Sequence, residues 1–329
     1  MERLSHAEVN RIRRTPGASI LLFITDRCPV GCAHCSVDSR PESPRISNFD
    51  LFAGIVDQLC GQPRLDLVGI SGGEPFVERR GLSLAVDRLV GAGKRIAIYT
   101  SGFWAAQEIP PPWIDEVLAR TDCIYLSTDA YHEAGTAAGQ FSNAARAVAR
   151  HGIPIIVQVI DENGMVERAR QLLVAAFGND WSRCAEIIPT FPLPYGRGAG
   201  IYSWKHRFAT RGFGVCNLAT SPVVRYDGLV TACCNETVIM GGGPPALRRD
   251  CADGVETSKA VAEFRNDPFF RAVSDVGIGE MAVDHPEFQD LADKEFSSIC
   301  GACWTMLRRR QETAGSRSLP VVEAGRSSS

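Results

Sequence analysis

Short apolar runs rich in β-branched residues alternate, up to about residue 190, with longer stretches whose apolar positions recur at helical spacing. The runs have the length of buried strands and the stretches that of amphipathic helices. We expect strands at Ser19–Thr25, Leu65–Ser71, Arg95–Ser101, Cys123–Thr128, Pro154–Ile160 and Cys184–Pro189. We expect helices at Phe49–Cys60, Leu82–Val90, Trp113–Ala119, Ser142–Ala149 and Met165–Phe177.

Six strand–helix repeats predict an α/β fold with a parallel sheet and right-handed crossovers. In such folds the functional side chains gather at the carboxyl ends of the strands. The candidate motifs follow this rule, because each comes directly after an expected strand. They are Cys28 after the first strand, Gly72 to Pro75 after the second, Ser101-Gly102 after the third and Asp129 after the fourth.

The pattern changes near Gly200, where glycine and proline become frequent and the helical periodicity fades. Residues 282–306 keep a partly helical pattern. We therefore expect an N-terminal extension over 1–18, a strand–helix domain over 19–199, a small cysteine-rich domain over 200–314 and a disordered tail over 315–329.

Composition narrows the class of protein. The chain has 329 residues, a net charge of −3 and no dominant basic block, which argues against a nucleic-acid partner. No stretch is long and apolar enough to span a bilayer, and the N-terminus lacks a signal-peptide core, so we expect no membrane association and a cytoplasmic protein. In that setting the 12 cysteines point to metal or redox chemistry rather than disulfides.

The first cysteine group places Cys28, Cys32 and Cys35 within eight residues, directly after a strand. Thiolates are soft ligands that suit zinc or iron–sulfur clusters. A structural zinc site needs four ligands, and His34 is poorly placed to share a metal with its neighbour Cys35. The spacing favours a three-thiolate site with one open metal position, with a zinc loop as the alternative.

Gly72-Gly73-Glu74-Pro75 forms a second motif. Glycines let the backbone approach a ligand closely, and a carboxylate at this place can pair with an ammonium group.

A second cysteine group lies beyond residue 200. Residues 223–231 read as a hairpin with an Asp-Gly turn at Gly228, which would bring Cys216 and Cys233 together. Cys300 and Cys303 form a C-x2-C pair at the start of a helical stretch. Four thiolates could close around one cluster, with Cys234 as an alternative to Cys233 and a structural zinc as the alternative metal. Three further cysteines fall on strand or helix patterns and are expected to be small buried hydrophobes: Cys60, Cys123 and Cys184.

The first two motifs together resemble those of the radical S-adenosyl-L-methionine (SAM) superfamily. The resemblance implies a partial (β/α)6 barrel and a 4Fe–4S cluster on Cys28, Cys32 and Cys35 whose fourth iron binds SAM. His34 stands where the family usually has an aromatic residue. The residues that the resemblance assigns to SAM are Gly72, Gly73, Glu74 and Pro75 at the amino group, with Ser127, Asp129 and Gln158 as further polar contacts.

The second cysteine group resembles the Twitch domain, a shorter relative of the SPASM domain. This resemblance implies one auxiliary 4Fe–4S cluster on Cys216, Cys233, Cys300 and Cys303. Gly196-Arg197-Gly198 also looks like a segment that such enzymes carry at the sixth strand.

The implied activity is reductive cleavage of SAM, with an electron from a donor such as flavodoxin or ferredoxin. The resulting 5′-deoxyadenosyl radical would take a hydrogen from a substrate carbon. We expect an oxidoreductase-type oxidation or rearrangement of a small polar metabolite in a biosynthetic pathway, since some eighteen residues before the first strand leave no room for a peptide-recognition domain.

Two alternatives to a metabolite enzyme remain. One is a maturase that forms a thioether or carbon–carbon crosslink in a ribosomally synthesised peptide. The other is a non-enzymatic zinc-binding protein. No catalytic acid or base is assigned by the sequence.

Overall fold

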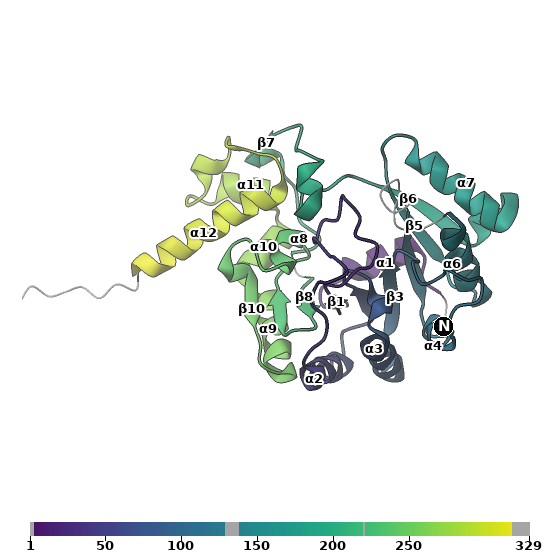
Figure 1. The fold of residues 1–329 in the computed structure, drawn as a ribbon. Helices are drawn as coiled ribbons and strands as arrows, with labels where there is room; N and C mark the ends of the chain where they lie inside the picture. The colour runs from purple at the N-terminus through teal and green to yellow at the C-terminus, as the bar shows by residue number, and fades with distance from the viewer. Residues whose placement is uncertain (1–2, 129–137, 220, 318–329) are drawn as a thin grey trace, which may run out of the picture.

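The computed structural model describes residues 3–128, 138–219 and 221–317 (Figure 1). Its centre is a nine-stranded sheet of order β10-β9-β8-β1-β2-β3-β4-β5-β6. Strands β1 to β6 are parallel to one another, and β8 is parallel to β1. These parallel strands are β1 (Ser19–Phe23), β2 (Leu67–Ser71), β3 (Arg95–Thr100), β4 (Cys123–Ser127), β5 (Ile155–Ile160), β6 (Ala185–Thr190) and β8 (Val223–Arg225).

In the described residues, five α-helices connect the first six strands in the order that the hydrophobic pattern predicts. They are α2 (Phe49–Cys60), α3 (Arg79–Gly91), α4 (Pro112–Ala119), α6 (Ala138–Arg150) and α7 (Met165–Phe177). Alternate strand residues such as Ile70, Ile98 and Val157 are fully buried beneath them in the main core. The largely parallel α/β fold is confirmed, and the bounds of the elements differ from the expected ones by only a few residues.

The other face of the sheet carries a helix that the pattern does not predict. Helix α1 (His6–Arg13) begins with a capping box between Ser5 and Glu8. Its apolar residues join a second core with residues from the starts of the strands, among them Leu67 and Ala97. The backbone N–H of Leu4 donates to the carbonyl of Asp122, just before β4. Helix α1 therefore lies over the amino-terminal ends of the strands.

The C-terminal part extends the same sheet. The expected hairpin is present as β8 and β9 (Leu229–Thr231), with Gly228 at a φ of 89° in its turn. Strand β10 (Arg248–Asp250) pairs with β9, while β7 (Phe208–Ala209) and β11 (Glu295–Phe296) form a separate two-stranded sheet. Because β8 pairs with β1, the hairpin continues the strand–helix part. The boundary near residue 200 stays a prediction.

Five helices follow the hairpin, more than the fading periodicity suggested. They are α8 (Glu236–Ile239), α9 (Gly254–Asn266), α10 (Pro268–Asp275), α11 (Ile278–Asp284) and α12 (Ile299–Arg317). Short 3-10 helices lie at Pro75–Val77, Gly178–Arg183, Gly196–Gly200, Thr210–Gly212, Pro245–Leu247 and Gln289–Leu291. Helix α12 reaches into the expected tail, whose residues 318–329 lie outside the described ranges.

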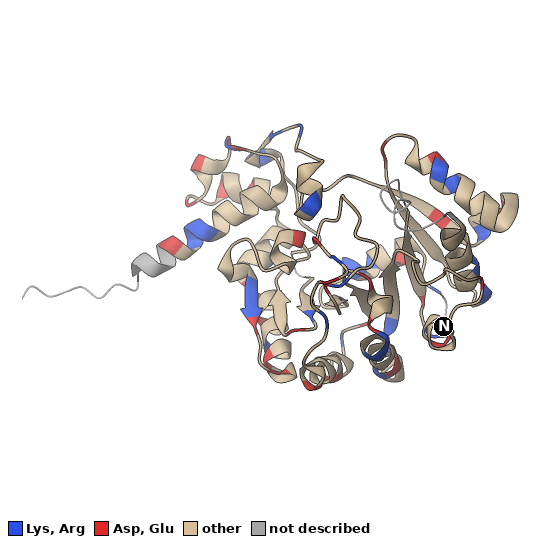
Figure 2. Ribbon diagram, in the orientation of Figure 1, with Lys and Arg blue, Asp and Glu red and all other residues tan. Residues whose placement is uncertain are grey.

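Basic and acidic residues are mixed along several helices. Figure 2 shows basic and acidic segments interspersed along α3, α7 and α12. Among the helices of the described residues, none has the length and apolar character needed to cross a membrane.

Candidate active site

A cavity of about 470 Å³ opens on the face of the sheet that carries α1. Cys28, Cys32 and Cys35 all line it, so the structure brings the first cysteine group onto one cavity. The other predicted residues on its wall are Gly72, Gly73, Ser127 and Gln158. Ser127 and Gln158 are neighbours in the register of β4 and β5. The expected clustering of polar groups at the carboxyl ends of the strands is thus observed for these residues, whereas Asp129 lies outside the described residues.

Backbone hydrogen bonds stabilise the segment 28–40 that carries the three cysteines, hereafter the cysteine loop. The N–H of Cys28 donates to the carbonyl of Arg40 at 3.0 Å, and that of Cys35 to the carbonyl of Cys32 at 3.2 Å. Burial, together with the nearby carboxylate of Glu74, raises the pKa of the Cys28 thiol to about 12. A thiol in this setting becomes a thiolate ligand only beside a strong cation such as iron.

No group of three or more His, Cys, Asp or Glu side chains in the described ranges is arranged to hold a single metal ion. A four-iron cluster needs a different arrangement, because each thiolate binds its own iron atom. Three cysteines on one cavity fit that requirement by their chemistry. The metal roles of the seven cysteines stay predictions.

Arg197, in the 3-10 helix Gly196–Gly200 that follows β6, binds the cysteine loop. Its Nη2 and Nε donate to the carbonyl of Cys32 at 2.7 and 3.0 Å, and its Nη1 donates to Asp38 Oδ1 and to the carbonyl of Ser39 at 2.7 and 2.9 Å. A Cβ on Gly196 would lie 2.5 Å from the carbonyl oxygen of Cys35. The segment noted by resemblance therefore packs directly onto the cysteine loop.

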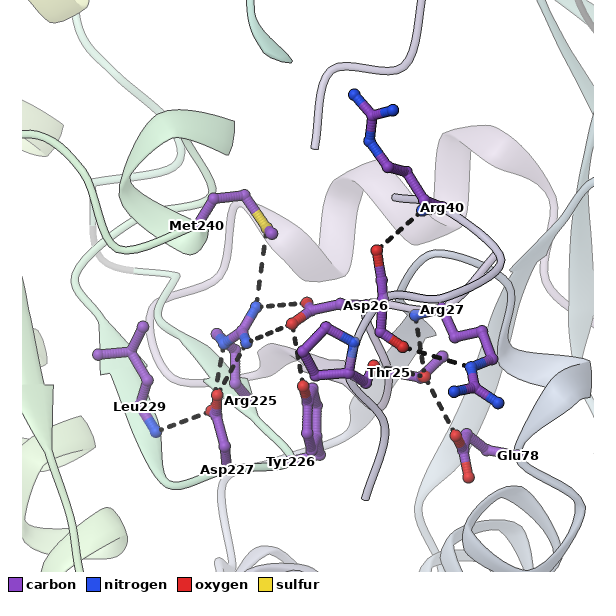
Figure 3. Close-up of polar contacts among 12 residues, drawn as sticks. Thr25, Asp26, Arg27, Arg40, Glu78, Arg225, Tyr226, Asp227, Leu229 and Met240 are labelled. Atoms are coloured by element: carbon purple, nitrogen blue, oxygen red, sulfur yellow. Dashed lines mark hydrogen bonds and ion pairs between the residues drawn. The ribbon is translucent and has the colours of Figure 1, made fainter. Parts of the chain in front are cut away.

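A second set of contacts fixes the chain just before Cys28 (Figure 3). The guanidinium of Arg225, from β8, binds both carboxylate oxygens of Asp26 at 2.8 and 2.9 Å. Tyr226 donates its hydroxyl to the same carboxylate at 2.9 Å, and Asp227 accepts from Arg225 on the other side. Sequence reasoning missed this group, because Asp26 and Arg225 are 199 positions apart in the sequence.

The two glycines of the second motif lie against the same segment. A Cβ on Gly72 would come 2.6 Å from the carbonyl oxygen of Thr25, and one on Gly73 would come 2.4 Å from that of Arg27. Only glycine fits at either place, so the backbone after β2 packs against the chain that leads to Cys28. Pro75 follows as the buried start of a 3-10 helix.

Glu74 lies inside this packing. Its carboxylate accepts hydrogen bonds from the hydroxyl of Thr100 at 2.8 Å, from the N–H and hydroxyl of Ser101 at 2.8 and 2.6 Å, and from the N–H of Phe76 at 3.2 Å. The side chain is fully buried and does not line the cavity. In this structure Glu74 joins the end of β2 to the end of β3, and its predicted contact with an amino group stays a prediction.

The second cysteine group is also brought into one region. The thiol of Cys233 interacts electrostatically with Cys303 and Cys300, and both of these interact with Cys216. Burial raises the pKa of all four thiols. Cys234 interacts with Cys216 and Cys300 as well, and it lines the cavity. Either neighbour could therefore be the fourth ligand.

Several cavity residues escaped sequence reasoning, among them Arg13, Tyr99, Thr190 and Glu236. Tyr99 and Thr190 could have been found from the alternation along β3 and β6. Arg13 could not, because it belongs to the unpredicted helix α1.

Comparison with known proteins gives a family for part of the chain. Residues 22–162 match the model of the Radical SAM superfamily. Two relatives from Bacillus subtilis are similar over shorter stretches. The putative peptide biosynthesis protein YydG is 21% identical over 35% of this chain and 36% of its own length. The antilisterial bacteriocin subtilosin biosynthesis protein AlbA is 23% identical over 48% of this chain and 38% of its own.

Solved structures share the fold. Streptococcus suis SuiB bound to S-adenosylmethionine superposes with a TM-score of 0.52 at 12% identity, over 82% of this chain and 70% of SuiB. The protein anSMEcpe, with bound AdoMet and the Cp18Cys peptide, gives a TM-score of 0.51 at 12% identity, over 91% of this chain and 97% of its own. The chain spans little more than a third of each curated relative. The family match identifies residues 22–162 as a radical SAM domain.

Proposed function

We propose that this chain is a radical SAM enzyme that modifies a peptide. The observation that carries the proposal is the joint placement of Cys28, Cys32 and Cys35 with Gly72 and Gly73 on one cavity. These residues belong to the segments that follow β1 and β2, inside the part of the chain that matches the radical SAM model.

The residues on the cavity fit a 4Fe–4S cluster and SAM by their donor chemistry. When bound, this pair supplies reductive cleavage of SAM and removal of a hydrogen from an unactivated carbon. In the proposal, Cys28, Cys32 and Cys35 ligate the cluster, the backbone at Gly72 and Gly73 approaches the cofactor, and Ser127 and Gln158 contact it. Cys28 and Cys32 are buried, whereas the other residues of this set are partly buried on the cavity wall.

The peptide substrate is favoured over a small metabolite by what the similar proteins do. YydG and AlbA are named for peptide and bacteriocin biosynthesis. SuiB and anSMEcpe have been solved with bound peptides, the precursor peptide SuiA in the first case. The proposal therefore takes up the maturase alternative of the sequence analysis, with a thioether or carbon–carbon crosslink as the product.

An auxiliary 4Fe–4S cluster is part of the proposal. Cys216, Cys233, Cys300 and Cys303 would hold it, and Cys234 lies near enough to replace Cys233. Such a cluster would accept the electron that the peptide loses when the crosslink closes. A flavodoxin or ferredoxin would supply the electron that starts the reaction.

The test uses the anaerobically reconstituted protein with SAM, a reductant and a precursor peptide encoded beside its gene. Mass spectrometry is expected to show a peptide lighter by a pair of hydrogen atoms, together with 5′-deoxyadenosine. The control is the variant Cys28→Ala/Cys32→Ala/Cys35→Ala, which should leave the peptide unchanged. Oxidation of a small metabolite with every peptide left intact would contradict the peptide proposal.

A further inference from the structure

The cavity contains one arginine whose role the proposed chemistry does not explain. Arg13 is in the last turn of α1, is half-buried and lines the cavity. Of the described residues on the cavity wall, it is the sole arginine or lysine, and Glu236 is the sole aspartate or glutamate.

The guanidinium of Arg13 has no partner within the described chain. No hydrogen bond or ion pair joins it to any residue in the described ranges, Glu236 included. Its electrostatic neighbours are the Tyr99 and Tyr125 hydroxyls and the Cys234 thiol. Burial raises the pKa of Tyr99 to about 12, and burial also raises that of Tyr125, so both phenols are neutral near pH 7. A guanidinium that lines a cavity and has no carboxylate partner among the described residues is suited to an anionic ligand.

Arg13 and Tyr99 line the cavity, and further aromatic and polar side chains pack behind them. Tyr99 and Tyr125 stack with ring centroids 4.4 Å apart. His6, on the same face of α1, has its Nδ1 at 3.2 Å from the Tyr125 hydroxyl and its Nε2 at 2.8 Å from Asn10 Nδ2. Gly69 also lines the cavity, and it packs closely there, since a Cβ at this position would come 3.1 Å from a methyl carbon of Leu21 and 3.4 Å from the Tyr99 ring.

Arg13 enters the cavity from the end opposite the cysteine loop. Helix α1 packs on the amino-terminal ends of the strands, whereas Cys28 and Gly72 follow their carboxyl ends. The five residues of β2 between these ends span roughly 15 Å at the usual rise per residue. The residues assigned to SAM and to the first cluster follow the carboxyl ends of the strands, whereas Arg13 has Tyr99, Tyr125 and Cys234, the alternative ligand of the auxiliary cluster, as its electrostatic neighbours.

We propose that Arg13 is the anchor for a carboxylate of the substrate, bound at the floor of the cavity. The inference rests on the proposed function for the identity of the cavity as the active site. The planar guanidinium can bind a carboxylate through two parallel hydrogen bonds, which fixes direction as well as position. It thereby sets which substrate carbon faces the cysteine loop.

The carboxylate has three possible sources, which share the same chemistry. It can be an acidic side chain of a peptide, the carboxyl terminus of a peptide, or an acid group of a small molecule. Four probes separate them: the acetylated and amidated tripeptides Gly-Glu-Gly and Gly-Gln-Gly, acetylated Gly-Gly-Gly with a free carboxyl terminus, and glutarate.

The experiment measures binding of each probe by calorimetry to the anaerobically reconstituted protein saturated with SAM. The wild type is expected to bind at least one carboxylate probe about tenfold more tightly than the amide probe, which corresponds to about 1.4 kcal/mol. Arg13→Gln should bind the carboxylate and amide probes equally. Arg13→Lys should keep part of the preference for carboxylates, because the lysine ammonium keeps the charge but cannot make two parallel hydrogen bonds. Arg14→Gln, at an exposed residue of the same helix end, should behave as wild type.

Three results would overturn the inference. In the first, the wild type binds all probes equally or binds none detectably. In the second, Arg13→Gln and Arg13→Lys keep the carboxylate preference unchanged. In the third, these variants lose as much affinity for SAM as for the carboxylate probes. If Arg13→Gln fails to fold, the carboxylate preference of Arg13→Lys relative to wild type is the deciding comparison. Formation of 5′-deoxyadenosine, followed in parallel, reports on the proposed function. Wild type that cleaves SAM but shows no carboxylate preference would refute the anchor alone.

Discussion

Asp26 and Arg225 form a bidentate ion pair, with distances of 2.8 and 2.9 Å between their carboxylate and guanidinium atoms. The side chains are 9% and 6% exposed. Asp26 lies two residues before Cys28, and Arg225 ends β8 in the C-terminal hairpin. This pair therefore fastens the start of the cysteine loop to the part of the chain that carries the second cysteine group.

Replacing Asp26 with Asn should lower the free energy of unfolding by about 3–5 kcal/mol, because it leaves a buried guanidinium without its principal counter-charge. Asp227→Asn is the matched control, since Asp227 binds the same guanidinium but is 42% exposed. Its cost should be about 1 kcal/mol or less. Urea unfolding of the cluster-free protein measures the free energy of unfolding of both variants. Equal decreases in the two variants would show that the buried Asp26–Arg225 pair contributes no more to stability than the exposed Asp227 contact.

Replacing Arg197 with Lys should speed the loss of iron from the reconstituted protein several-fold, because an ammonium cannot make the forked contact with the Cys32 carbonyl. Arg40→Lys is the control: Arg40 pairs with the same Asp38 at 3.0 Å but is 50% exposed. Iron bound per chain is followed against time with a chelator. Equal rates in the two variants would contradict the account of Arg197.

Replacing Gly196 with Ala should destabilise the protein by at least about 1–2 kcal/mol, the cost of a left-handed backbone for a residue with a side chain. Gly196 has a φ of 52°, and the new Cβ would meet the Cys35 carbonyl. Gly200→Ala, in the same 3-10 helix, has open space around its Cβ. Thermal unfolding should separate the two variants, and a Gly196→Ala protein as stable as Gly200→Ala would refute the close packing.

Glu74 gives a prediction for pH. Burial raises its pKa, against the hydrogen bonds from Ser101 and Thr100. The carboxyl of Glu74 therefore stays protonated to a higher pH in the folded protein than in the unfolded chain. The protonated group makes its whole contribution to stability below about pH 4.3, and this contribution is lost as the pH rises through the folded-state pKa. In cluster-free protein, the stability of wild type relative to Glu74→Gln should fall from pH 4 to pH 7. A relative stability that rises over this range would contradict it.

The strand ends were predictable because their side-chain pattern is local. Apolar runs gave β1 to β6, and the motif after each run then had a defined place. Helix α1 escaped because only Val9 and Ile12 are buried in its eight residues. The Asp26–Arg225 pair joins residues 199 positions apart, and it depends on Phe23 and Arg225 being partners in the register of β1 and β8. The donors around Glu74 likewise appear only once β2 and β3 lie side by side.

The central claim is that Cys28, Cys32 and Cys35 hold the cluster that cleaves SAM. The most direct measurement is 5′-deoxyadenosine formed by the reduced, reconstituted protein, with iron counted in the same samples. Wild type should hold about eight irons and form the product, and Cys300→Ala/Cys303→Ala should still form it. The variant Cys28→Ala/Cys32→Ala/Cys35→Ala should keep about four irons and form none. Product from that triple variant would contradict the assignment.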